Sequence, residues 1–255
     1  MAMKCEKMRC FSSNDLQQTE SNDIVVLYHG STYEVSNPEF GVGRSDNDYG
    51  SGFYTTRIRS KAVSWAQNMG NPNSSVLNSY KLDLSQLNIC NLDDYGVLAW
   101  IAEIAFNRRI KSELADEFLP EFIKRYKIDT SNFDVIIGYR ADDSYTDVIA
   151  AFCDGLINCD EVQRLFYKGN LGEQYFIKSE KAFNLLQFII SEDVCTETND
   201  DEKYAESNSR AEVHKFIMER RTAIAKRFSV PAITIIDAIS NNYNYNKEYK
   251  LYEVV

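Results

Sequence analysis

One group of residues with chemical potential lies where an apolar run gives way to a loop. Residues 24–29 are β-branched, apolar or aromatic up to His29, and Gly30 and Ser31 follow. A histidine donates or accepts a hydrogen bond to a ligand hydroxyl, a glycine lets a ligand approach the backbone, and a serine adds a second hydroxyl. Taken alone, however, a packed and hydrogen-bonded histidine explains the pattern better.

Two aromatic residues form the second group. Tyr54 lies in a short strand-like segment after Gly50-Ser51-Gly52, and Trp65 lies in the helix expected next. Two such rings at close spacing would hold a flat, cationic heterocycle such as nicotinamide by stacking and cation–π attraction. The alternative is that each ring is part of the core.

The third group is the strand expected over residues 173–177. Side chains alternate between the faces of a strand, so Glu173 and Gln174 cannot both point into one pocket. Gln174 and Phe176 are expected to share one face, and Tyr175 the other. This strand therefore offers either a carboxylate or a neutral amide to a ligand.

Charged residues outside these groups are harder to assign. Arg44, in a glycine-rich loop, is a candidate for contacting a pyrophosphate, although an exposed loop arginine explains it equally well. Asp46 and Asp48 in the same loop make a phosphate site less favourable. Arg108 and Arg109 are expected on a solvated helix face.

The elements that must position these groups follow no regular βαβ alternation, which favours an α+β fold. Strands are expected over residues 24–29, 52–56, 75–84, 133–139 and 173–177. One helix is expected with Ser60 as its N-cap, and further helices over 92–126 with a break near Pro120, 144–155, 159–167, 179–186, 211–228 and 233–239. We expect a flexible tail (1–22), a main domain (23–190), an acidic linker (191–209) and a small helical C-terminal extension (210–255).

Composition excludes several classes of protein. Aromatic residues make up 13% of the chain and hydrophobic residues 44%, as in folded globular proteins. The net charge of −10 gives no general attraction to nucleic acid, and no apolar segment is long enough to be a signal sequence or to cross a membrane. The six cysteines lack metal-ligand spacing, so we expect reduced thiols, no metal and a cytoplasmic protein.

Together, the three groups resemble signature regions of the ADP-ribosyltransferase superfamily, in its diphtheria-toxin and PARP-like His-Tyr-Glu branch. The chain also resembles the DUF3990 group within that superfamily. The resemblance covers residues 24 to about 190, and it rests on Tyr28-His29-Gly30-Ser31, on GSGFYTT (50–56), on Ala141-Asp142-Asp143 and on QYFIKSEKAFNLL (174–186). It implies split, mixed β-sheets with flanking helices.

The resemblance also implies a role for each site residue, with NAD⁺ as co-substrate. His29 would bind the adenosine-side ribose and the Gly30 backbone the nicotinamide carboxamide, with Ser31 beside them. Tyr54 would stack on the nicotinamide ring and Trp65 would supply a second stacking ring. Thr55 and Thr56 would brace the pocket.

One position departs from the branch. A glutamate normally precedes the aromatic residue of the last strand, where it binds the nicotinamide ribose and stabilises the transition state, whereas this chain has Gln174. A neutral amide still hydrogen-bonds a hydroxyl but brings no negative charge and is no general base. Glu173, through a bulge, or a carboxylate of Asp142, Asp143 or Asp147 would compensate.

The resemblance therefore implies an enzyme that cleaves NAD⁺ and transfers ADP-ribose to a protein or nucleic acid, and a bacterial toxin, toxin–antitoxin component or defence effector would fit. One alternative is a weakly active or inactive module that binds NAD⁺ or ADP-ribose. Another is a scaffold whose C-terminal region binds a partner such as an antitoxin or chaperone. Neither alternative involves a membrane.

Overall fold

The structure is a computed structural model. It describes residues 23–254 except 70–73, 111, 113–114, 142, 170–171, 199, 226–232, 242 and 249–250. The expected tail, residues 1–22, lies outside the described residues. Among the described helices, none is both long and apolar enough to cross a membrane.

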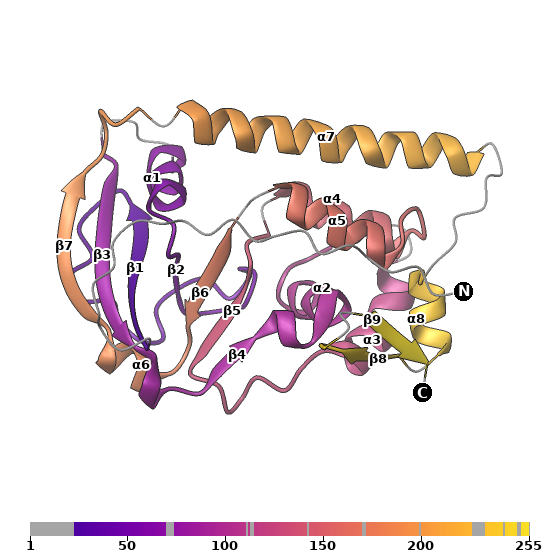
Figure 1. Ribbon diagram of the computed structural model, residues 1–255, viewed down its shortest axis with the longest axis horizontal. Coiled ribbons are helices and arrows are strands. Elements are labelled where there is room, and N and C mark those ends of the chain that lie inside the picture. Colours follow the sequence, from indigo (N-terminus) through magenta and orange to yellow (C-terminus); the bar gives the residue numbers. More distant parts are fainter. Residues whose placement is uncertain are drawn as a thin grey trace.

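Helices and strands are mixed along the chain (Figure 1). The strands are β1 (Ile24–Ser31), β2 (Phe53–Thr55), β3 (Val76–Asp83), β4 (Ile89–Asn91), β5 (Val135–Tyr139), β6 (Glu173–Ile177), β7 (Gln187–Asp193), β8 (Tyr243–Asn246) and β9 (Leu251–Val254). The α-helices are α1 (Arg59–Asn68), α2 (Gly96–Asn107), α3 (Ala115–Tyr126), α4 (Asp143–Cys153), α5 (Cys159–Gly169), α6 (Glu180–Leu185), α7 (Asp200–Ala225) and α8 (Ile235–Ser240). This confirms the α+β class.

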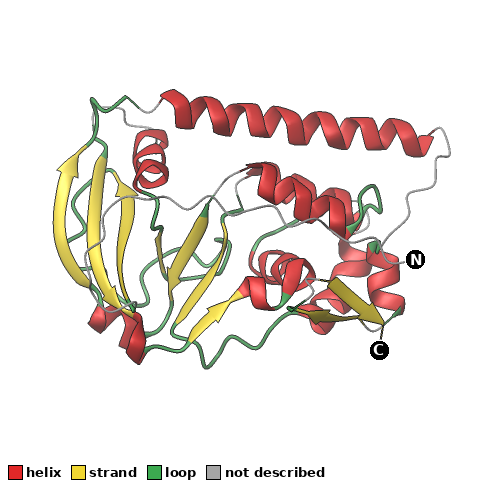
Figure 2. Cartoon of the chain, in the orientation of Figure 1, coloured by secondary structure: helices red, strands yellow, loops and turns green. Residues whose placement is uncertain are grey.

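Two main sheets lie side by side, and helices gather beyond the second (Figure 2). The first has the order β1-β3-β7 and is antiparallel. The second has the order β2-β6-β5-β4, in which only β4 and β5 run parallel. An isolated bridge between Tyr28 and Thr56 joins β1 to the chain just after β2, so the edges of the two sheets meet there.

The core is divided by the second sheet. Residues such as Leu27 and Ile177 fill the space between the two sheets. On the other face, Phe176 packs with residues of α2, α4 and α5, including Trp100. Because the strand alternates, β6 contributes to both layers.

The long helix α7 runs along one side of the molecule, where it contacts α1, α4 and α5 (Figure 1). Val213 and Ile217, which are spaced to share one face of this helix, are buried. Ile224 carries no described side chain and Phe228 lies outside the described residues. The inner face of α7 is therefore attached along most of the main domain.

Several expected boundaries differ from the structure. Residues 191–209 are not an extended linker, because β7 continues to Asp193 and α7 begins at Asp200, where Glu206 is buried against the main domain. Helix α1 begins one residue before Ser60, and Ile58 is its N-cap. Pro120 lies inside α3, where a proline removes one helical hydrogen bond without ending the helix, and the helical break falls instead after α2.

The C-terminal extension is also only partly helical. After α8 the Tyr- and Asn-rich tail forms the hairpin β8–β9, and the Tyr252 hydroxyl of β9 accepts a hydrogen bond from the amide of Leu98 in α2. The sequence of the tail has no apolar alternation that would predict this hairpin.

Candidate functional site

His29 lies at the joint between the two sheets. Its side chain lies on the same face of β1 as the buried side chains of Val25 and Leu27. The imidazole ring packs on the ring of Phe53, with the two centroids 4.4 Å apart. Its Nδ1 lies 2.8 Å from the carbonyl oxygen of Tyr54. A carbonyl only accepts, so Nδ1 carries the proton and donates.

The protonation of His29 follows from its surroundings. Burial lowers the pKa of His29 below 6.5, and the hydrogen bond to the Tyr54 carbonyl opposes this only in part. The neutral ring with a proton on Nδ1 leaves Nε2 as an acceptor. His29 is thus prepared to accept a hydrogen bond from a hydroxyl.

Gly30 and Ser31 are occupied by local structure. A Cβ on Gly30 would lie 2.0 Å from the carbonyl oxygen of Ala62, so only glycine allows α1 to pack this closely on β1. The buried Ser31 hydroxyl donates to the carbonyl of Tyr33 and accepts from Asn78 Nδ2 at 2.9 Å. These contacts fix the end of β1.

Tyr54 fixes the loop that precedes β2. Its hydroxyl donates to the carbonyl of Gly50 at 2.7 Å and accepts from the amide of Tyr49 at 3.0 Å. Its ring packs on those of Tyr49 and Phe176. Tyr54 pairs with Phe176 across the strands, so its side chain lies on the same face of the second sheet as Gln174.

Gln174 is buried at 4% exposure and bonded to a carboxylate. Its Nε2 donates to Asp48 Oδ2 at 2.7 Å. The same oxygen accepts from the amide of Ala141 at 2.8 Å, and Asp48 Oδ1 accepts from Arg108 at 3.0 Å. Because Nε2 donates to Asp48, the Gln174 amide is oriented, and its carbonyl oxygen is the group that can accept a hydrogen bond from a ligand.

Asp48 balances desolvation against its three donors. Burial raises the pKa of Asp48, while the bonds from Ala141, Gln174 and Arg108 act in the opposite direction. Two of the donors meet on one oxygen, which gives that oxygen no room for a proton. We therefore treat Asp48 as the carboxylate that orients the Gln174 amide.

Glu173 begins β6 on the opposite face from Gln174 and is exposed. The strand is regular, pairing Glu173 with Tyr139 and Gln174 with Gly138, without a bulge that would exchange the two side chains. Desolvation and the charge of Asp93 raise the pKa of Glu173, and the charge of Arg57 acts in the opposite direction.

The other carboxylates expected to compensate are not placed beside Gln174. Asp147 is exposed on α4. Asp142 lies outside the described residues, and no side-chain position is described for Asp143. The carboxylate that does reach Gln174 is Asp48.

Trp65 is half-buried on α1 and faces a cation. The guanidinium of Arg140 lies over its ring, with Cζ 5.1 Å from the centroid. Arg140 thus makes with the face of Trp65 the cation–π contact that the sequence predicts for nicotinamide. Tyr54 packs on its own neighbours, so the structure does not bring Tyr54 and Trp65 together as a stacked pair.

The remaining expected residues have separate roles. Arg44 is exposed and forms a two-pronged ion pair with Asp46, at 2.9 and 2.7 Å, within its own loop. Thr55 is fully buried and donates from Oγ1 to the carbonyl of Tyr175 at 2.8 Å. Thr56 Oγ1 accepts from the amide of Ile58 and so braces the start of α1.

Sequence reasoning missed two members of this network. Asp48 was read only as unfavourable to phosphate, and Arg108 was placed on a solvated face, whereas Arg108 also donates to the carbonyl of Ala141 at 2.6 Å. The position of Asp48 just before the GSGFYTT segment (50–56) was the one feature of the sequence that placed it near the candidate site. Within the described residues, no cluster of three or more His, Cys, Asp or Glu side chains has the arrangement of a metal site.

The chain was compared with known proteins. No curated protein and no solved structure matched it. One family model, "Protein of unknown function (DUF3990)", matches residues 25–188, which include the second sheet, nearly all of β1, all of β3 and the network around Gln174. The chain therefore belongs to the DUF3990 family.

Proposed function

We propose that this domain binds NAD⁺ and transfers its ADP-ribose to a macromolecule. The observation that carries the proposal is the grouping of three signature residues: His29 bonds to the backbone of Tyr54, and Tyr54 shares a sheet face with Gln174. They come from β1, β2 and β6, which are far apart in sequence. The meeting of two sheets at this point agrees with the fold that the resemblance implies.

In the proposed complex, each of two polar groups binds one ribose of the dinucleotide. Nε2 of neutral His29 accepts a hydrogen bond from one ribose hydroxyl, and the carbonyl oxygen of Gln174 accepts from another. Asp48 holds the Gln174 amide in the orientation that this requires. Hydrogen bonds that are oriented before the ligand arrives lose less free energy on binding.

In the proposed reaction, the bond between the ribose carbon and the nicotinamide nitrogen breaks and nicotinamide leaves with the electron pair. An acceptor nucleophile then bonds to that carbon and releases its proton to solvent. The positive charge that develops on the ribose is stabilised by nearby negative charge. Gln174 supplies only a dipole, backed by the Asp48 carboxylate, whose charge Arg108 partly neutralises.

That neutralisation favours a second candidate, a module that binds NAD⁺ or ADP-ribose without turnover. A fixed dipole stabilises a developing cation less than a carboxylate does, and removing one oriented group of this kind typically lowers a rate about 10²–10³-fold. In this case binding would persist and chemistry would be very slow.

Mass spectrometry separates the two candidates. The protein is incubated with NAD⁺ and a cell lysate, and both free nicotinamide and ADP-ribose adducts of protein and nucleic acid are measured. Transfer predicts both products, with Tyr54→Ala reducing them and the exposed-residue variant Tyr204→Ala leaving them unchanged. Saturable NAD⁺ binding without either product would establish the binding module instead.

A further inference from the structure

A second buried polar cluster lies beneath α7, next to the candidate site. Glu206 of α7 is only 4% exposed, and its carboxylate faces three side chains of the main domain. Oε1 lies 3.9 Å from Lys61 Nζ and 3.7 Å from Arg140 Nη1, and Oε2 accepts from Ser64 Oγ at 3.3 Å. Lys61 itself is only 2% exposed.

These contacts are loose for a buried cluster. Both cation-to-carboxylate distances exceed those of a charge-assisted hydrogen bond, which are usually about 2.7–2.9 Å. Among the described residues, Trp65 Nε1, Arg140 Nη1 and Glu206 Oε1 are buried with no hydrogen-bond partner. Buried polar atoms normally have partners, so three exceptions in one cluster indicate a site built for another ligand.

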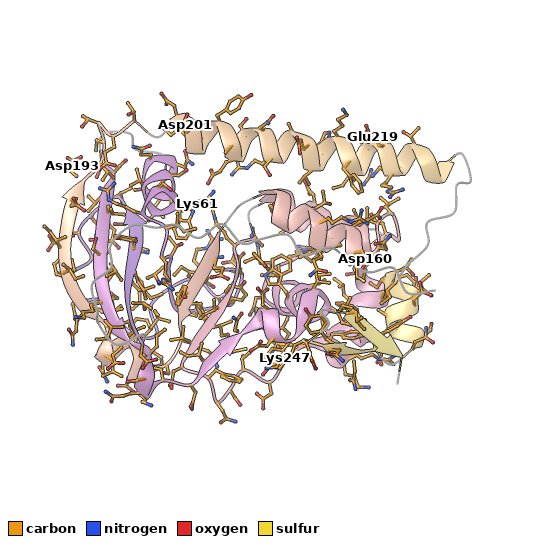
Figure 3. The ribbon with its side chains drawn as sticks, viewed as in Figure 1. Lys61, Asp160, Asp193, Asp201, Glu219 and Lys247 are labelled. Carbon is orange, nitrogen blue, oxygen red and sulfur yellow. The ribbon has the colours of Figure 1, made fainter. Side chains whose placement is uncertain are left out.

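The cluster adjoins the network around Gln174. Arg140 immediately precedes Ala141, whose amide bonds to Asp48. The amide of Arg140 donates to the carbonyl of Gly172, two residues before Gln174. Figure 3 shows Lys61 beneath the first half of α7, between α1 and the second sheet.

The donors suit a phosphate anion. Lys61 and Arg140 supply positive charge, and Ser64 Oγ and Trp65 Nε1 supply further donors. An anionic carboxylate already occupies the centre of this arrangement. A phosphate carries more charge and more acceptor oxygens than one carboxylate, so it satisfies Trp65 Nε1 and Arg140 Nη1, which have no hydrogen-bond partner within the part of the chain that the structure describes.

We propose that Lys61, Ser64 and Arg140 bind the diphosphate of the dinucleotide, and that Glu206 on α7 occupies this anion site in the absence of ligand. The identity of the ligand rests on the proposed function. Ligand binding then requires α7 to release Glu206 at one end. At its other end α7 stays attached through the ion pair of Arg220 with Glu161 on α5.

Inorganic pyrophosphate tests the anion site without involving nicotinamide. Calorimetry compares the wild-type chain with Glu206→Gln, which keeps the size of the side chain and removes its charge. A competing charge at 3.7–3.9 Å is at the weak end of measured close charge pairs, so we expect about tenfold tighter pyrophosphate binding. Lys61→Met in the Glu206→Gln background should abolish the gain.

Glu219→Gln is the matched control. Glu219 lies on the same helix, is 64% exposed and pairs with Lys215 one turn away, so its loss should not change pyrophosphate binding (Figure 3). Equal pyrophosphate affinities of the wild-type, Glu206→Gln and Glu219→Gln chains would overturn the proposal. Pyrophosphate binding with this pattern, but no NAD⁺ binding, would retain the anion site and reject only the dinucleotide as its ligand.

Hydrogen exchange of the wild-type chain keeps the proposal testable if Glu206→Gln does not fold. Saturating pyrophosphate should speed amide exchange in the first half of α7, because the ligand displaces Glu206. The last turns of α7 should change less. Unchanged or slower exchange in the first half would contradict displacement.

Discussion

Asp48→Asn tests whether the buried carboxylate organises the site. In the wild-type chain both carboxylate oxygens accept, Oδ2 from Gln174 and Ala141 and Oδ1 from Arg108. Asparagine replaces one oxygen with a donor. In one orientation that donor meets the amide of Ala141, and in the other it meets Arg108, so neither orientation satisfies the network.

The magnitude follows from the partners. Breaking a fully buried ion pair costs about 3–5 kcal/mol, and a lost hydrogen bond to a charged group about 1.5–3 kcal/mol. Arg108 keeps 22% of its side chain exposed and regains some hydration, which places the expected loss near the lower bound, about 3 kcal/mol.

Urea unfolding followed by circular dichroism measures this loss. The control is Asp46→Asn in the same loop, which removes an exposed ion pair with Arg44 and should leave the free energy of unfolding unchanged. If Asp48→Asn and Asp46→Asn have the same effect, the buried network does not stabilise the fold as argued.

Three further predictions concern the joint between the sheets. Gly30→Ala should lower the free energy of unfolding by about 3 kcal/mol in urea, since the new methyl overlaps the backbone of Ala62; an effect near zero would mean that α1 is not packed on β1 as described. Tyr54→Phe should cost about 2 kcal/mol and speed exchange of the Tyr49 amide, and unchanged exchange would show that the hydroxyl does not hold the loop. Because the pKa of His29 is lowered on folding, the unfolded chain binds more protons than the folded chain below about pH 6.5. The stabilisation from His29 should therefore be fully present above about pH 6.5 and be lost as the pH falls below it. His29→Gln should weaken this dependence, and a free energy of unfolding that does not change with pH in the wild-type chain would contradict it.

Local patterns predicted the elements that carry the site. The strand over 173–177 was expected with its faces assigned, and the structure places Gln174 with Phe176 and Tyr175 on the other side, because strand alternation is a local property. The helices near 144–155 and 159–167 were likewise expected from their periodicity and are α4 and α5.

What depends on distant contacts was not predicted. Asp48 and Gln174 are bonded across 126 positions of sequence, and no pattern near either residue announces the other. The start of α7 was read as a linker because its acidic residues look solvated, yet Glu206 is buried by partners on α1 and after β5. Charge in a sequence marks exposure only when no distant partner neutralises it.

Calorimetric titration with NAD⁺ tests the central claim most directly, with His29→Ala and His214→Ala compared with the wild-type chain. His214 is the only other histidine in the sequence and is exposed on α7, which makes it a matched control. The account predicts saturable NAD⁺ binding that weakens at least about tenfold in His29→Ala, the cost of one lost hydrogen bond of about 1.4 kcal/mol, and is unchanged in His214→Ala. Absence of binding by the wild-type chain, or equal binding by His29→Ala, would contradict it.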